Sequence, residues 1–211
     1  MRIPRWCGFG AAAVLLLLTA APLRADSIYS NFNTGLQSNW WTVGANYGYT
    51  PAMLFTAGGS GTLSDVVIEA YIGGGNPSLA AYLEADNGGT PGTTLDTLTT
   101  SQSLPDPGGE AAITFTCSTC SQLVQNNNYF VVLADTASGS VAGWVWANQS
   151  GYALTYNNTV GWENESAYGN LGAFQVDATP EPPSLILLFT GLLGAGLFLR
   201  RRRQMPVNRP V

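Results

Sequence analysis

Leu63-Ser64-Asp65-Val66-Val67-Ile68-Glu69-Ala70-Tyr71-Ile72 is the stretch that decides the fold. Apolar side chains stand at alternate positions, and the positions between them are mostly polar or amphipathic: Val66, Ile68 and Ala70 alternate with Asp65, Val67, Glu69 and Tyr71. Because successive side chains of a strand point to opposite faces, this near-alternation predicts a strand with one buried face and one wetter face.

The residues on either side of this stretch repeat the same kind of pattern. Gly, Thr, Ser and Asn are abundant, long helix-forming runs are absent, and short β-branched or aromatic segments recur between turn signals. Further strands are expected at Met53–Thr56, Ser78–Ala85, Ala111–Cys117, Tyr129–Ala134, Val141–Ala147, Tyr152–Tyr156 and Ala173–Val176. The turns between them are expected at Gly58–Gly61, Gly73–Pro77, Asp86–Gly92 and Pro105–Gly109. The sequence therefore predicts an all-β chain, with a single antiparallel β-sandwich, jelly-roll-like, over residues 26–179.

The N-terminal segment has the three parts of a secretory signal peptide. Arg2 and Arg5 form a positive region, Gly10–Ala21 is apolar, and Ala25 offers a small residue for cleavage. The signal peptide is predicted to span residues 1–25, so that the exported chain begins at Asp26.

The C-terminal segment has the pattern of a membrane anchor. Pro180-Glu181-Pro182 precedes the apolar run Ser184–Leu199, and four arginines follow it: Arg200, Arg201, Arg202 and Arg203. Proline suits the start of a helix, and at about 1.5 Å per residue the run gives a transmembrane helix of roughly 25 Å, slightly short of a hydrocarbon core of about 30 Å. The arginines are expected to stay in the cytoplasm and stop transfer, with residues 204–211 as a cytoplasmic tail.

This tail resembles the PEP-CTERM sorting signal of Gram-negative bacteria, in which Pro-Glu-Pro, a short transmembrane helix and an arginine cluster occur in this order. The resemblance covers residues 180–203. It implies that an exosortase-type membrane enzyme recognises Pro180, Glu181 and Pro182 and cleaves near them. The protein would be tethered in the inner membrane before processing, and would then reach the cell surface or an exopolysaccharide matrix. The alternative is an uncut single-span anchor.

The charged side chains between the two terminal segments are all negative. Of the thirteen acidic residues only Glu181 lies outside residues 26–179, which leaves twelve there. All eight basic residues lie in the predicted signal peptide or after residue 199, and the chain has no histidine. Such a domain repels phosphate polyanions, which argues against nucleic acid as a partner. It also leaves carboxylates as the only usual catalytic bases.

A second resemblance concerns residues 27–176. Several strand and turn patterns are similar to those of the exported bacterial domains called choice-of-anchor R: Trp40-Trp41-Thr42-Val43-Gly44, Met53-Leu54-Phe55-Thr56-Ala57-Gly58, Tyr71-Ile72-Gly73-Gly74, Ala81-Tyr82-Leu83-Glu84-Ala85-Asp86, Gly89-Thr90-Pro91-Gly92 and Asn128-Tyr129-Phe130-Val131-Val132-Leu133. The resemblance implies a surface-exposed β-sandwich. It implies no catalytic residues.

Two cysteines, Cys117 and Cys120, are separated by two residues at the end of a predicted strand. In an exported protein this spacing favours a local disulfide. A thioredoxin-type redox pair would need the first cysteine at a helix N-terminus, and a metal site would need two further soft ligands. The sequence offers neither.

Carboxylates give two further hypotheses. Glu163 and Glu165 would share one face of a strand and could act as an acid and base pair on a glycoside, although acids in such a loop are usually just solvated. Asp86 and Asn87 lie in a loop whose oxygens could bind calcium, the one cofactor that the sequence suggests. The spacing does not fit an EF-hand.

Tryptophan is frequent for so short a domain. Sugar faces often stack on exposed indole rings in β-sandwich proteins, so the candidates for sugar stacking are Trp40, Trp41, Trp144, Trp146 and Trp162. Trp144 and Trp146 project to the same face of one predicted strand. The alternative is that this face is the inner one and that both rings fill the core.

Three functions from different classes remain. The leading one is a non-enzymatic surface or matrix protein with a structural or adhesive β-sandwich. The second is a carbohydrate-binding module, with a polysaccharide as partner. The third is a glycoside hydrolase that uses Glu163 and Glu165, whose two carboxyl groups would have to lie about 5 to 9 Å apart in one cleft.

Overall fold

The computed structural model describes residues 25–44, 48–180 and 191. The predicted signal peptide before Ala25 lies outside the described residues, and so do Glu181, Pro182 and Arg200 to Arg203 of the predicted tail. Within the described ranges, no helix is long and apolar enough to cross a membrane. The chain divides into two compact units between Pro180 and Glu181.

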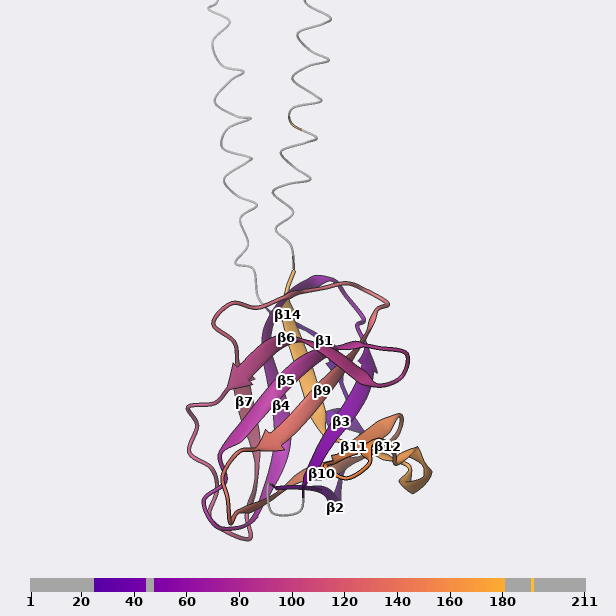
Figure 1. The fold of residues 1–211 in the computed structure, drawn as a ribbon. Helices are drawn as coiled ribbons and strands as arrows, with labels where there is room; N and C mark the ends of the chain where they lie inside the picture. Colours follow the sequence, from indigo (N-terminus) through magenta and orange to yellow (C-terminus); the bar gives the residue numbers. More distant parts are fainter. Residues whose placement is uncertain (1–24, 45–47, 181–190, 192–211) are drawn as a thin grey trace, which may run out of the picture. The chain divides into compact units, whose positions relative to one another are not determined.

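The first unit is all-β and antiparallel (Figure 1). Its elements are β1 (Asp26–Ser30), η1 (Phe32–Thr34), β2 (Leu36–Val43), β3 (Tyr49–Thr56), β4 (Gly61–Gly74), β5 (Leu79–Asp86), β6 (Pro91–Thr99), β7 (Glu110–Thr116), β8 (Gln122–Leu123), β9 (Asn128–Asp135), β10 (Val141–Ser150), β11 (Ala153–Asn157), β12 (Gly161–Asn164), η2 (Ser166–Tyr168), β13 (Asn170–Gly172) and β14 (Phe174–Thr179). The all-β prediction is confirmed, and each predicted strand overlaps an observed one. β1, β2, β6, β8, β12 and β13 were not among the predicted strands.

β4 is the strand around which the others assemble, as its alternation predicts. Val66, Ile68 and Ala70 are fully buried. On its two edges β4 pairs with β7 through Ile68↔Ile113 and with β14 through Phe174↔Ile68. Its C-terminal part pairs with β10, where Trp144 stands opposite Ala70. β4 thus pairs with a strand that lies more than a hundred residues further along the chain, because Ile68 stands opposite Phe174.

The strands form one continuous sheet in the order β1-β14-β4-β7-β6-β5-β9-β3-β11-β12, with β10 joining β4 to β2. The pairing is thinnest between β6 and β7, where Thr99↔Thr116 is the pair observed. Strands on both sides of that point contribute to a single core, for example Ile68 and Val176 from one side and Leu83 and Leu133 from the other.

The two ends of the described fold are adjacent. β1 pairs with β14, and Asp26 stands opposite Ala178. In Figure 1 this end of the sheet is at the top, and β2, β11 and β12 lie at the opposite, lower end. The site described below lies at that lower end.

Candidate functional site

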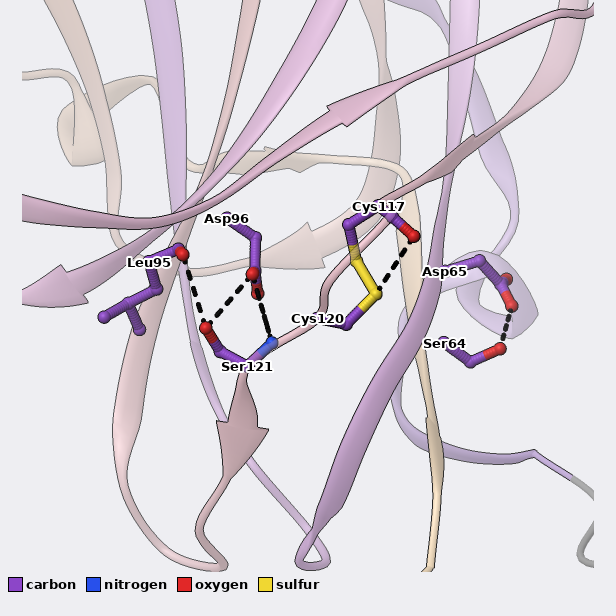
Figure 2. Close-up of a disulfide and its surroundings, with 7 residues drawn as sticks. All are labelled: Ser64, Asp65, Leu95, Asp96, Cys117, Cys120 and Ser121. Atoms are coloured by element: carbon purple, nitrogen blue, oxygen red, sulfur yellow. Dashed lines mark hydrogen bonds between the residues drawn. A yellow bond between two sulfur atoms is a disulfide. The ribbon is translucent and has the colours of Figure 1, made fainter.

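The predicted disulfide between Cys117 and Cys120 is present, with 5.5 Å between the two Cα atoms. It closes the loop that follows β7 and precedes β8, and both cysteines pack against the core. Figure 2 shows the next residue, Ser121, directed at the carboxylate of Asp96 on β6. The Ser121 backbone N–H donates to both Asp96 oxygens, at 3.1 and 3.0 Å, and its hydroxyl donates at 3.0 Å. With strands on both sides and this tether, the disulfide is a structural closure of a turn.

Asp86 and Asn87, the predicted calcium ligands, shape the turn between β5 and β6. The Asp86 carboxylate accepts a hydrogen bond from the backbone N–H of Gly89 at 2.7 Å, and the backbone N–H of Asn87 donates to the carbonyl of Thr90 at 2.8 Å. In the part of the chain that the structure describes, no group of three or more His, Cys, Asp or Glu residues could hold a metal ion. Calcium binding at Asp86 and Asn87 stays a prediction.

Trp144 is a core residue. Its side chain is 0% exposed, its indole N–H donates to the carbonyl of Ala173 at 2.9 Å, and its ring meets Phe174 edge to face at 5.6 Å. A ring enclosed in this way cannot stack on a sugar, so Trp144 leaves the set of candidate stacking residues.

Trp162 lies apart from the other candidates. Its ring meets Tyr156 edge to face at 5.3 Å and packs against a small apolar cluster that includes Phe130 and Leu154. Leu154 and Tyr156 lie on one face of β11, and Thr155 between them lies on the other. Trp162 therefore belongs to the face opposite Thr155.

The remaining candidates meet at a hollow of about 300 Å³. Its lining residues come from five parts of the fold: Trp40, Trp41 and Thr42 of β2, Tyr49 of β3, Trp146 of β10, Thr155 of β11, and Glu165 just after β12. Consecutive residues of a strand alternate between its faces, so three consecutive lining residues indicate that the hollow runs along the edge of β2. Trp40, Trp41, Trp146 and Glu165 are candidates that the sequence predicts, whereas Thr42, Tyr49 and Thr155 are lining residues that it does not predict.

β2 sends its two tryptophans to opposite faces. Trp41 turns inward, where it is largely buried, meets Trp146 with 5.4 Å between ring centroids, and donates its indole N–H to the carbonyl of Asn170 at 3.1 Å. The indole nitrogen of Trp146 is buried, and the described residues give it no hydrogen-bond partner. The inner wall of the hollow is therefore aromatic, with one buried donor that lacks an acceptor.

Trp40 lies on the outer face and is 38% exposed. Its ring stacks on Tyr71 with 4.2 Å between centroids and 24° between planes. The ring crosses Gly143 of β10 so closely that a Cβ atom there would collide with it. Glycine at position 143 thus allows the indole to lie flat on the sheet, and Tyr71 holds it there.

The two predicted catalytic carboxylates are in different surroundings. Glu165 lines the hollow, is partly buried, and accepts a hydrogen bond from the Thr155 hydroxyl at 3.2 Å. Its backbone N–H donates to the carbonyl of Ala153 at 3.0 Å, which fixes this residue beside β11. Glu163 is exposed on β12 and is not among the lining residues. Of the two predicted catalytic acids, Glu165 lines the hollow and Glu163 does not.

Two acidic side chains of β4 lie near acidic side chains of the neighbouring strands β14 and β7, outside the lining of the hollow. Asp65 stands opposite Asp177 of β14. Burial raises the pKa of Asp65, and the Asp177 carboxylate raises it further, whereas the Ser64 hydroxyl lowers it. Burial likewise raises the pKa of Glu69, to which the nearby Glu110 carboxylate adds. These like-charge contacts have no Lys, Arg or His within residues 26–179 to offset them.

Mild acidification is therefore expected to stabilise the fold. For Asp65 and Glu69 the pKa in the folded state lies above the ordinary values of 3.8 and 4.5 that apply to the unfolded chain, so the folded state binds protons more tightly than the unfolded state. The resulting stabilisation is complete below those values and is lost as the pH rises through the folded-state pKa. The thermal unfolding midpoint should rise when the pH is lowered from 7 to 4.5. Asp65→Asn should flatten this dependence, and Asp106→Asn in an exposed turn is the matched control; a midpoint that falls on acidification would contradict the prediction.

No protein-family model matches the chain, and the comparison with curated proteins likewise found no match. The resemblances of the tail and of the β-domain thus stay predictions that rest on the quoted motifs.

Proposed function

We propose that the chain is an exported bacterial protein of the cell surface or exopolysaccharide matrix, sorted by an exosortase-type system, whose non-catalytic β-domain has a structural or adhesive role. The observation that carries this proposal is the position of the sorting motif relative to the fold. β14 ends at Thr179, and the Pro-Glu-Pro motif begins at Pro180. β1 begins at Asp26, directly after the expected signal-peptide cleavage. Both processing events would therefore release the fold without removing a residue of any strand.

The finer architecture proposed for this domain is a jelly-roll-like β-sandwich. The single pair Thr99↔Thr116 between β6 and β7 supports a division of the sheet into two layers. The shared core supports the same division, because Ile68 of β4 and Leu133 of β9 belong to one buried cluster.

The test of the sorting proposal is replacement of Arg200, Arg201, Arg202 and Arg203 by serine in the natural host. Export is expected to continue, because the signal peptide is intact, whereas membrane retention and processing near Pro180 should be impaired. The measurement is the intact mass of the protein from the cell surface and the medium. Arg209→Ser, which removes one arginine outside the cluster, is the control. A quadruple variant processed like the unaltered protein would refute the proposed role of the cluster.

Saccharide binding is a second candidate function, and the hollow favours it. Aromatic rings beside hydroxyl and carboxylate groups match the two sides of a sugar, which has apolar C–H faces and polar edges. Hydrolysis receives less support, because Glu165 lines the hollow without Glu163, and glycoside hydrolases generally need two carboxyl groups at one bond. The adhesive role proposed for the domain would then consist in holding polysaccharide.

A further inference from the structure

We infer that the hollow between β2 and β11 selects uncharged saccharides over acidic ones, with Tyr49 as a stacking surface and Glu165 as a hydrogen-bond acceptor. This inference rests on the saccharide-binding function proposed above and specifies its ligand class. It draws on three features: the exposed aromatic side chains, the fixed carboxylate, and the charge of the whole domain.

Two tryptophan side chains at the hollow are held in place before any ligand arrives. Tyr49 is 38% exposed at the hollow, as is Trp40. Trp40 is fixed by its stack on Tyr71 and by its close approach to Gly143, and Trp41 is fixed by its hydrogen bond to Asn170. Because Trp40 and Trp41 are already fixed, a sugar that packs on this wall loses little binding free energy to the ordering of these two side chains.

The carboxylate of Glu165 determines which polar groups of a ligand can form a hydrogen bond at this wall. An ionised carboxylate accepts hydrogen bonds and donates none, so it matches sugar hydroxyl groups. One oxygen already accepts the Thr155 hydroxyl, which orients the carboxylate on the wall. A ligand carboxylate, sulfate or phosphate at this position would meet a like charge in a partly buried site, where repulsion is poorly screened.

The charge of the domain extends this selection beyond the hollow. Residues 26–179 hold twelve acidic side chains and no Lys, Arg or His, as counted above. A polysaccharide with a repeating negative charge would therefore find no cationic side chain on the domain at either end of a bound segment. An uncharged polysaccharide carries no such penalty, and its binding should depend little on ionic strength.

The experiment uses the full-length chain in a detergent without a sugar headgroup, so that the detergent does not compete for the hollow. Affinity electrophoresis compares three uncharged polysaccharides, dextran, laminarin and galactomannan, with two acidic ones, alginate and polygalacturonate. We expect retardation by at least one uncharged polysaccharide, unchanged between low and moderate salt, and none by the acidic pair at either salt concentration.

Variants assign the binding to this hollow. Tyr49→Ala and Glu165→Gln are each expected to weaken binding of the retained polysaccharide about tenfold, which corresponds to loss of one contact of about 1.4 kcal/mol. Glu163→Gln makes the same charge change two residues away outside the lining, and Trp162→Ala removes an aromatic ring on the other face of the β11–β12 hairpin. Both controls should bind like the unaltered chain. Thermal unfolding of each variant establishes that it is folded.

The outcomes separate the two proposals. If none of the five polysaccharides retards the chain, the saccharide-binding function and the inference both fail. If alginate or polygalacturonate binds as well as the uncharged polysaccharides, saccharide binding stands and the inferred selectivity is wrong. If folded Tyr49→Ala and Glu165→Gln bind normally while Trp162→Ala does not, the site lies on the other face and the inference is overturned.

Discussion

Trp144→Ala is expected to lower the free energy of unfolding by roughly 3 to 5 kcal/mol, the range for removal of a large aromatic side chain from a core. Trp144 is 0% exposed and lies where β10 meets both β2 and β4, opposite Trp41 and Ala70. The substitution empties space beside Phe174 and leaves the Ala173 carbonyl without its indole donor. Domains of this size are commonly stable by about 5 to 15 kcal/mol, so the variant should lose a large share of its stability. Chemical denaturation monitored by circular dichroism measures the change.

The matched comparison is Trp40→Ala on the neighbouring strand. This change removes the same side chain from a partly exposed position, where less apolar surface is lost from contact with the protein. It should therefore cost clearly less than Trp144→Ala. If Trp144→Ala lowered the free energy of unfolding by less than Trp40→Ala, the assignment of Trp144 to the core would be contradicted.

Asn31→Ala is expected to lower the free energy of unfolding by roughly 2 to 6 kcal/mol, although it removes only a small polar side chain. Asn31 is 0% exposed between β1 and η1. Its side-chain amide donates to the carbonyl of Gly172 at 2.9 Å and accepts from the backbone N–H of Phe174 at 2.7 Å. Alanine would leave both backbone groups unpaired in a buried place, at about 1 to 3 kcal/mol for each. Urea unfolding at constant pH measures the loss.

Asn33→Ala is the control, because Asn33 lies in η1 two residues away and is exposed. Surface substitutions of this kind usually change stability by less than about 0.5 kcal/mol. Equal effects of the two substitutions would show that the paired hydrogen bonds of Asn31 do not carry the expected stabilisation.

The strands that could be predicted from the sequence are those in which apolar residues occupy the buried positions. Val66 and Ile68 of β4 are buried and Val67 between them is only partly buried, which is the alternation of a pleated strand. β9 is instead a short apolar run, buried from Tyr129 to Leu133, whose β-branched and aromatic residues favour a strand. β2 was missed because its first half, Leu36 to Asn39, is mostly polar and exposed at a sheet edge. β6 was missed partly because an inward position holds Asp96, whose burial is compensated by Ser121, a residue 25 positions away.

The site was less predictable than the fold. Composition pointed to tryptophans and to paired acids, and Trp41, Trp146 and Glu165 do line one hollow. Their meeting depends on the registers of β2 with β10 and of β11 with β12, which no local pattern encodes. The register of β2 with β10 also places Trp144 opposite Trp41, in the core. Glu163 stands opposite Thr155 on β12 but is exposed and does not line the hollow. Tyr49 and Thr155 gave no signal, because tyrosine and threonine are ordinary strand residues.

The adjacency of β1 and β14 has a mechanical consequence for a protein attached to a surface through its C-terminal end. A pull transmitted at Pro180 would act along β14, which is paired on one edge with β1 and on the other with β4. Hydrogen bonds between antiparallel strands run perpendicular to the strands. A force along β14 would therefore load the hydrogen bonds to β1 and to β4 together, in shear. It would not break the bonds of one strand pair one after another. β2 and β11, which contribute to the lining of the hollow, lie at the lower end of Figure 1, and β14 reaches the upper end. If the hollow binds a polysaccharide as proposed, a force on that polymer would be transmitted through the sheet before it reached Pro180.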